Sequence, residues 1–209
     1  MNQLGKKIVK LLKKLPVDIG QAERKHTSAG KKIAISFISK VSKSQNKTAL
    51  DIGCRDGYWS KWLVKQGYKV TSLDIEPHFK GAIQHDLNEG LPFKNNTFDL
   101  VLCTEVIEHV QKPSYLLTEI DRVLKPKGIS VITTPNSNWF LYWFLKPLGW
   151  TPAMLQNPDH KHFFNESMIR SVCRGYRLYG YFPYMFIFLR LDFWIGLLSP
   201  TFILIRLKR

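Results

Sequence analysis

Two apolar stretches, each closely followed by turn residues, constrain the fold of this chain more than any other feature. The first, residues 49–57 (ALDIGCRDG), indicates a β-strand that leads through a glycine-bearing turn into a helix. The second, residues 72–75 (SLDI), indicates a strand that ends in an acid, Asp74. Parallel sheets built this way bind ligands at the carboxyl ends of their strands. Glycines there let the backbone come close to the ligand, and an acid about 20 residues further along can accept hydrogen bonds from ribose hydroxyls. The pattern predicts an α/β fold that binds a nucleoside.

Apolar runs and turn residues alternate along the rest of the chain. They predict strands at 48–52, 69–74, 98–103 and 128–133, a short strand near 82–85, and later strands at 176–184 and 201–207. They predict helices at 57–66, 105–110, 113–124 and 166–174. Strands that alternate with helices of this length indicate a parallel sheet with helices on both faces.

The net charge of +15 is concentrated at the two ends of the chain. Residues 1–47 carry 12 Lys and Arg against 2 acidic residues, and residues 136–209 carry 9 against 3, whereas residues 48–135 carry 10 against 11. This asymmetry indicates an anionic partner, which is either a membrane surface or nucleic acid. The alternative is that the lysines are simply exposed to water and bind no partner. The three cysteines form no C-x-x-C pair, so we expect no disulfide framework, no zinc site and a reducing, cytosolic setting.

Two segments have a composition typical of membrane contacts. In residues 3–15, leucine and isoleucine recur at helical spacing opposite five lysines, which predicts a basic amphipathic helix that lies in a membrane interface or docks on the domain. Half of residues 139–150 are aromatic, which favours a bulky apolar ligand, a membrane contact or a buried lid. The charge-free runs at 178–189 and 193–205 are too short to cross a bilayer, and lysines interrupt the N-terminal apolar stretches, so we expect neither a transmembrane segment nor a secretory signal.

The order of the motifs narrows the interpretation. The turn at 53–57 and Asp74 are followed by further motifs, which are HDL at 85–87, LPF at 91–93, FDLVLCT at 98–104, EVIEHV at 105–110, LKPKG at 124–128 and TTPN at 133–136. In this order the segments resemble the class I S-adenosylmethionine-dependent methyltransferases, in particular the small-molecule and quinone-type members. The resemblance covers residues 47–136 and, more weakly, residues 159–209.

The resemblance implies a doubly wound, mostly parallel, seven-stranded sheet with helices on both faces and an antiparallel last strand, the Rossmann-like methyltransferase fold. It places a methyltransferase domain at residues 47–209, after a basic helical extension at 1–46 that includes a second helix near 23–43. Within the domain it leaves an aromatic-rich insertion at 137–158 and an apolar insert at 186–198.

The resemblance also implies which residues hold S-adenosylmethionine. Asp74 binds both ribose hydroxyls, Ile75 packs on the adenine face, and Asp86 with the backbone of Leu87 meets the adenine edge. Arg55 departs from the family pattern, which has a glycine there; an arginine at positive φ costs about 1 kcal/mol, although it could cover the cofactor carboxylate. For the aspartates, the alternative role is to cap the following helix or turn. The complete predicted set is Asp51, Gly53, Arg55, Gly57, Asp74, Ile75, Asp86, Leu87 and Thr104.

Methyl transfer is an in-line displacement, in which the protein aligns the partners and removes the proton of a hydroxyl acceptor. Glu105, Glu108 and His109 would share one face of a helix starting at residue 104, and the unperturbed histidine pKa of about 6.5 suits a general base. The predicted catalytic residues are His109 and Glu105. The resemblance also admits Mg²⁺ held by Glu105, Glu108, His109 and either His160 or His162; the alternative is that these side chains only support the fold.

These observations predict a cytosolic enzyme, peripheral on the inner face of the cell membrane. Its acceptor is a hydroxyl of an apolar or lipid-linked small molecule, such as a quinone precursor or a polyprenyl-linked glycan. Two alternatives stay open. The basic ends also fit an RNA methyltransferase, although the chain has no recognisable RNA-binding module. A non-catalytic protein that keeps the fold is favoured by Arg55 alone.

Overall fold

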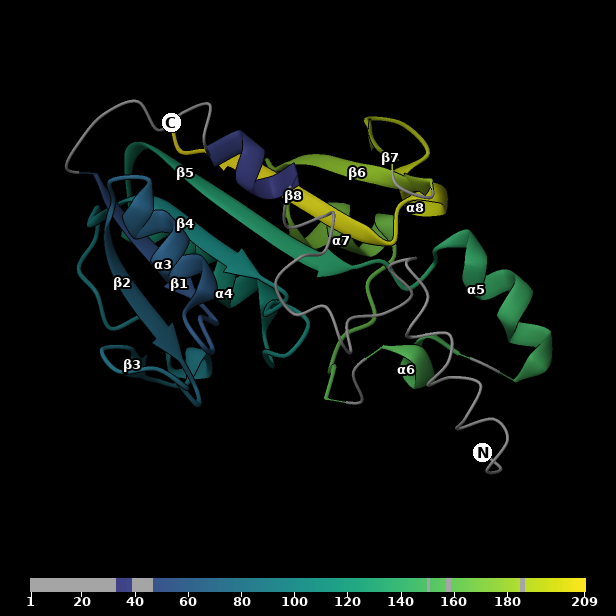
Figure 1. The fold of residues 1–209 in the computed structure, drawn as a ribbon, viewed down its shortest axis with the longest axis horizontal. Helices are drawn as coiled ribbons and strands as arrows, with labels where there is room; N and C mark the ends of the chain where they lie inside the picture. The colour runs from purple at the N-terminus through teal and green to yellow at the C-terminus, as the bar shows by residue number, and fades with distance from the viewer. Residues whose placement is uncertain (1–32, 39–46, 150, 157–158, 185–186) are drawn as a thin grey trace.

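A mixed eight-stranded sheet forms the centre of the described part of the chain, with the strand order β3-β2-β1-β4-β5-β8-β6-β7 (Figure 1). The structure is a computed structural model that describes residues 33–38, 47–149, 151–156, 159–184 and 187–209. The strands are β1 (Thr48–Ile52), β2 (Lys69–Asp74), β3 (Ile83–Gln84), β4 (Phe98–Thr104), β5 (Leu124–Pro135), β6 (Arg177–Tyr184), β7 (Ile187–Leu191) and β8 (Thr201–Leu207). β1 to β5 pair parallel, whereas β8 lies antiparallel between β5 and β6.

Helices cover both faces of this sheet. The helices are α3 (Tyr58–Lys65), α4 (Pro113–Val123), α5 (Phe140–Leu145), α6 (Pro152–Leu155), α7 (Glu166–Val172) and α8 (Ile195–Leu198), with the short 3₁₀ helices η1 (Leu87–Glu89) and η2 (Lys146–Leu148). α4 and α7 pack in one hydrophobic cluster, and α3 packs with the helical stretch at 33–38 in another. The strands supply both clusters because their side chains alternate: Leu50 and Ile52 face α4, whereas Ala49 faces α3.

The expected fold is confirmed, with one strand more than predicted. Each predicted strand is present, as are the helices expected at 57–66, 113–124 and 166–174. The additional strand is β7, which lies within the segment expected to be an apolar insert (186–198) and forms an antiparallel hairpin with β6. The sequence conceals this hairpin because residues 181–191 contain no Gly, Asn or Asp to mark a turn.

The helix predicted at 105–110 is wrong, because these residues form a turn. Glu105 has a left-handed φ of 58°, and its N–H donates to a carbonyl oxygen of β5 at 2.9 Å, so this residue extends the strand pairing instead of starting a helix. Beyond it, Val106, Ile107 and Val110 are all buried. Packing of these apolar side chains overrides the local helical spacing.

Part of the predicted N-terminal extension lies outside the described residues. The amphipathic helix expected at 3–15 falls there, and of the helix expected at 23–43 only residues 33–38 are described, which are helical. Among the described helices, none combines the length and the apolar character that crossing a membrane requires. The division at residues 46 and 47 and the limits of the insertion at 137–158 stay predictions.

Candidate functional site

A cavity of about 360 Å³ opens at the carboxyl ends of β1, β2 and β4. Its volume lies in the range of small-ligand sites. Its wall contains most of the residues that the sequence analysis singled out, namely Gly53, Arg55, Asp74, Ile75, Asp86, Leu87, Glu105 and His109. The other lining residues are Glu76, His78, Asn88, Val106, Val110, Asp159 and Lys161. The fold therefore brings residues from distant parts of the chain to one edge of the sheet, the edge at which parallel sheets bind ligands.

The turn after β1 requires glycine at two positions. Gly53 has a φ of 74°, and a Cβ there would run into the side chain of Val106. Gly57 has a φ of 73°, and a Cβ there would lie 2.7 Å from the ring of Phe79. Because L-residues adopt this φ at a cost and the space is filled, neither position accepts a larger residue without rearrangement.

Arg55 adopts the same left-handed conformation without being a glycine, with a φ of 48°. Its N–H donates to Oδ2 of Asp74 at 2.7 Å, so a charge-assisted hydrogen bond fixes the strained turn. The residue is exposed and lines the cavity. The positive φ considered at this position is therefore present, and its cost is about 1 kcal/mol.

Asp74 ends β2 and joins two backbone segments. Its second carboxylate oxygen, Oδ1, accepts from the N–H of Glu76 at 2.9 Å, in addition to the bond from Arg55. Each carboxylate oxygen has a further lone pair with which to accept from a ligand. Ile75 follows it with 62 % of its surface exposed, which is a high exposure for an isoleucine in a cavity wall. The pair presents an acidic and an apolar contact side by side.

Asp86 caps the short helix η1. Its Oδ1 accepts from the backbone N–H of Asn88 at 2.9 Å and from the Asn88 side-chain amide at 2.8 Å. Asp86 and Leu87 also line the cavity, so the capping role and a ligand contact are both open to this residue.

Three predicted cofactor residues lie outside the cavity wall. Gly57 underlies the ring of Phe79, and Thr104 is buried at the end of β4. Asp51 is only 1 % exposed, and its Oδ2 accepts from the hydroxyl of Ser60 at 2.6 Å. Because Ser60 belongs to α3, this hydrogen bond joins α3 to β1 behind the turn. Asp51 therefore has a structural contact, but a side-chain bond to Ser60 and not the helix cap given as the alternative, because Gly57 occupies the N-cap position of α3.

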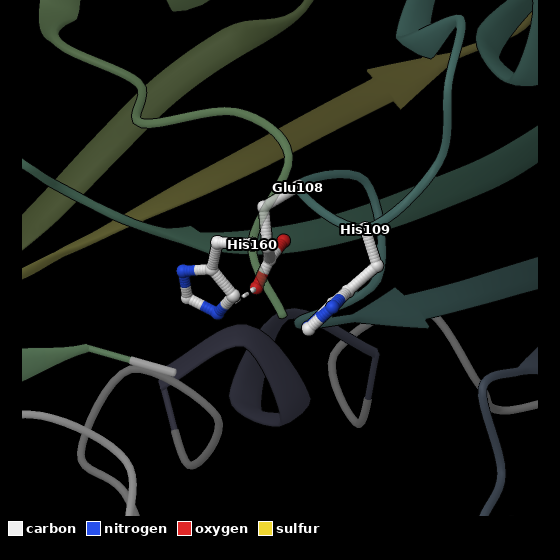
Figure 2. Close-up of side chains that lie close together, drawn as sticks. All are labelled: Glu108, His109 and His160. Atoms are coloured by element: carbon white, nitrogen blue, oxygen red, sulfur yellow. Dashed lines mark ion pairs between the residues drawn. The ribbon is translucent and has the colours of Figure 1, made fainter. Parts of the chain in front are cut away.

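Glu108, His109 and His160 bring one carboxylate and two imidazoles to one point (Figure 2). Their candidate ligand atoms lie within 4.8 Å of one another. The rings of His109 and His160 meet edge-on, at 84° and 4.7 Å between centroids. Glu108 and His160 are buried, whereas His109 is half-buried and lines the cavity, so the cluster is reached from the cavity through His109.

Each member of this cluster is held by a further residue. The contacts are Thr134 Oγ1 to Glu108 Oε2 (2.9 Å), His109 Nδ1 to the Asp159 carbonyl (3.2 Å) and His160 Nδ1 to Gln156 Oε1 (3.4 Å). A carbonyl oxygen only accepts, so Nδ1 carries the proton in both rings and Nε2 is left unprotonated. His160 Nε2 is buried and has no hydrogen-bond partner among the described residues.

Burial lowers the pKa of both histidines. For His160, burial and then the nearby His109 bring the pKa to about 4. For His109, burial lowers the pKa and outweighs the hydrogen bond to the Asp159 carbonyl. Both rings are therefore neutral at pH 7, the form that accepts a proton or binds a metal. The 3.9 Å between His160 Nε2 and Glu108 Oε1 is accordingly a contact between a carboxylate and a neutral ring.

The other residues predicted as metal ligands lie apart from this cluster. Glu105 Oε1 accepts from the hydroxyl of Thr133 at 2.8 Å. His162 Nε2 lies 3.0 Å from the carbonyl oxygen of Val110, and its ring stacks on Phe164. Of the two histidines between which the sequence left a choice, the structure places His160 beside Glu108.

The supporting residues Thr134, Gln156 and Asp159 were not predicted. Asp159 contributes its backbone carbonyl, which any residue type would supply, so no sequence signal marks it. Gln156 is buried behind the cluster, in a segment for which the sequence indicated only aromatic composition. Thr134 belongs to the TTPN motif at 133–136. Neighbouring side chains along a strand point to opposite faces, so Thr133 donates to Glu105 while Thr134 donates to Glu108. This alternation is the one sequence signal for Thr134.

Comparison with known proteins places the chain among methyltransferases. A family model described as "Methyltransferase domain" matches residues 24–178. A ubiquinone biosynthesis O-methyltransferase of Caulobacter vibrioides is 37 % identical over 147 residues, which cover 61 % of this chain and 58 % of the relative. The enzyme of the same name from Hydrogenovibrio crunogenus is 30 % identical over 124 residues, covering 53 % and 52 %. The chain thus spans little more than half the length of the curated relatives it matches.

A solved structure has the same fold. The S-adenosylmethionine-dependent methyltransferase from Archaeoglobus fulgidus superposes with a TM-score of 0.61 at 17 % identity, over 89 % of this chain and 97 % of that one.

Proposed function

Because this chain belongs to the methyltransferase domain family, we propose that it transfers a methyl group from S-adenosylmethionine to a hydroxyl of an apolar or lipid-linked small molecule. The observation that carries the proposal is the cavity at the carboxyl ends of β1, β2 and β4, where a glycine turn, an acid and an exposed apolar side chain lie together. The names of the curated relatives support an acceptor of the quinone-precursor kind.

The cofactor roles follow from the cavity wall. Asp74 accepts from the ribose hydroxyls with the lone pairs that its backbone contacts leave, and Ile75 packs against the adenine. Asp86 and Leu87 meet the edge of the adenine. Arg55 covers the carboxylate of the methionine part, because its positive charge stands at the glycine turn.

His109 acts as the general base toward the acceptor. It is neutral, lines the cavity and donates from Nδ1 to the Asp159 carbonyl, which leaves Nε2 to accept the hydroxyl proton. Glu105 adds a carboxylate to the same wall, where it favours the positive charge of the cofactor's sulfonium.

Holding a divalent cation is the alternative role for His109, because its one free lone pair, on Nε2, either accepts a proton or binds a metal. Glu108, His109 and His160 offer one carboxylate and two neutral imidazoles, and each is oriented by a hydrogen bond of the kind that positions metal ligands. Mg²⁺, the cation expected from the sequence, prefers oxygen ligands, whereas two imidazoles suit Zn²⁺ or Fe²⁺ better. When bound, a cation here would polarise the acceptor hydroxyl.

Titration calorimetry of the full chain with S-adenosylmethionine and S-adenosylhomocysteine tests the proposal. We expect binding in the micromolar range common for enzyme substrates. Release of S-adenosylhomocysteine is then measured with catechol-type phenols and polyprenyl-linked sugars as acceptors. Wild-type protein that binds neither compound would favour the non-catalytic alternative.

Replacing Arg55 with glycine separates backbone strain from cofactor binding. We expect the thermal midpoint to rise, because glycine removes a left-handed strain of about 1 kcal/mol, while affinity for S-adenosylmethionine falls several-fold. Arg55→Lys is the matched control, since it keeps the charge and the strain and should retain most of the affinity. Unchanged affinity in Arg55→Gly would leave the arginine without a role in cofactor binding.

We propose that the protein works on the inner face of the cell membrane, where it would reach a lipid-linked acceptor. The basic ends attract anionic lipid, and Phe144 and Phe193 are 70 % and 66 % exposed. We expect co-sedimentation with anionic liposomes, with a fraction still bound at about 0.5 M salt, where the Debye length is only a few ångströms. Deleting residues 1–15 should weaken this binding and leave cofactor affinity intact.

Nucleic acid is the competing anionic partner. Its binding would fall steeply with salt because it releases counterions from phosphates. Protein that stays in the supernatant with liposomes but binds single-stranded RNA tightly at physiological salt would favour the RNA methyltransferase.

A further inference from the structure

A second cavity lies at the end of the molecule away from β3, where Figure 1 shows α5 and α8. Its volume is about 530 Å³. It is lined by Asn138, Trp143, Asn165, Glu166, Ser167, Trp194, Gly196 and Leu197. None of these described residues also lines the cavity at β1, β2 and β4. Two tryptophans from separate elements thus line one cavity, to which the proposed methyl transfer assigns no role.

Trp194 is held in a conformation that its own side chain does not favour. Its backbone is left-handed, with φ 48° and ψ 30°, which a glycine adopts without cost. The side chain is 70 % exposed, so its burial in the core does not offset this cost. Backbone strain of this kind clusters at ligand-binding and active sites.

Trp143 is also exposed, and a hydrogen bond holds its ring in one orientation. It is 56 % exposed on α5, and its Nε1–H donates to Oδ1 of Asn138 at 3.3 Å. The hydrogen bond ties the indole to the loop before the helix, beside the cavity that both residues line. A ring fixed in this way loses little conformational entropy when a ligand packs against it.

The charges around this cavity favour a neutral ligand. Glu166 is the one charged side chain among the described lining residues. Its Oε1 accepts from Arg170 at 2.8 Å and its Oε2 accepts from the N–H of Gly196 at 2.6 Å. A cation would therefore meet a carboxylate that is already neutralised, on a protein of net charge +15. An anion would find no cationic lining residue in the described wall.

The remaining groups suit a molecule that has both apolar faces and hydroxyls. Asn165 uses its Oδ1 to cap α7 through the N–H of Met168, so its amide hydrogens are donors to a ligand. Ser167 adds an exposed hydroxyl. Flat aromatic rings combined with amide and hydroxyl groups give rigid contact area and adaptable hydrogen bonding. We propose that this cavity binds a neutral saccharide, with a sugar ring packed on the indoles of Trp143 and Trp194.

This inference goes beyond the proposed function, because saccharide binding needs no cofactor and is measured without it. The full chain is labelled with 5-fluorotryptophan, and the fluorine spectrum of its six tryptophans is followed during titration with soluble oligomers of glucose, galactose, mannose and N-acetylglucosamine at millimolar concentrations. We expect at least one oligomer to shift two signals, those that disappear in Trp143→Phe and Trp194→Phe.

Two double variants give the matched comparison. Trp143→Ala with Trp194→Ala should weaken saccharide binding at least tenfold, while Phe144→Ala with Phe193→Ala should leave it unchanged, because these exposed phenylalanines do not line the cavity. Trp194→Gly should raise the thermal midpoint while it weakens binding, which a structural tryptophan would not do.

Three results would overturn the proposal. The first is that no oligomer shifts a tryptophan signal. The second is that phosphatidylglycerol vesicles shift the two signals and saccharides do not, which would make the surface a membrane contact. The third is a Trp194→Gly protein that is less stable and binds saccharide as the wild type does.

Discussion

Replacing His109 with alanine is expected to lower turnover by about 100-fold or more while affinity for S-adenosylmethionine stays nearly unchanged. The ring is neutral, lines the cavity and donates its Nδ1 proton to the Asp159 carbonyl, so the substitution removes the proposed general base. Turnover is measured as released S-adenosylhomocysteine and affinity by calorimetry. His78→Ala is the control, because His78 lines the same cavity but does not belong to the cluster with Glu108 and His160.

A chelator separates the two roles open to His109. If it acts only as a base, wild-type turnover is indifferent to chelation. If it holds a cation instead, turnover falls on chelation, returns when the cation is restored, and falls similarly in Glu108→Gln and His160→Ala, since these residues complete the ligand set. Full turnover in His109→Ala would remove both roles.

Replacing Asp74 with alanine is expected to weaken S-adenosylhomocysteine binding at least tenfold, or about 1.4 kcal/mol, through the loss of two hydrogen bonds to ribose. The same carboxylate accepts from the N–H groups of Arg55 and Glu76, so weaker binding alone could reflect a displaced glycine turn. The measurement therefore needs a ligand that lacks the ribose hydroxyls.

The 2′,3′-dideoxy form of S-adenosylhomocysteine is that ligand. Wild-type protein should prefer the natural compound at least tenfold, and Asp74→Ala should bind the two compounds equally. Asp74→Asn, which keeps one acceptor oxygen, should retain part of the preference. A variant that loses affinity but keeps the full preference for the hydroxyls would show that Asp74 only supports the turn.

The parallel half of the sheet follows from local patterns. β1, β2 and β4 alternate apolar side chains or run continuously apolar between turn residues, so their bounds match the prediction within a residue. The same reasoning fails for the segment after β4, residues 105–110. Its spacing is helical, yet burial of Val106, Ile107 and Val110 and the left-handed Glu105 give a turn.

The candidate site likewise has one part that the sequence predicts and one part that only the structure places. Asp74 and Gly53 lie at fixed distances along one βαβ unit, so the sequence alone brings them to one cavity. His160 meets Glu108 only because the N–H groups of Lys161 and His162 donate to the Glu108 carbonyl, at 2.9 and 3.1 Å. No periodicity encodes such a contact across 50 residues, which is why the choice between two histidines needed the structure.

These backbone bonds have a consequence for how proteins of this fold diversify. The segment after β5 is anchored at its start, where the N–H of Ser137 donates to the Phe164 carbonyl, and again at the docked histidine loop. Between the two anchors, Trp139, Tyr142 and Leu155 form a small core of their own. A stretch that is held at both ends and packed on itself can change as a unit in length and composition, provided that Gln156, whose Oε1 lies 3.4 Å from His160 Nδ1, is kept. Changes within residues 138–155 could then alter what this segment contacts while His109, the proposed base, keeps its hydrogen bond to the Asp159 carbonyl.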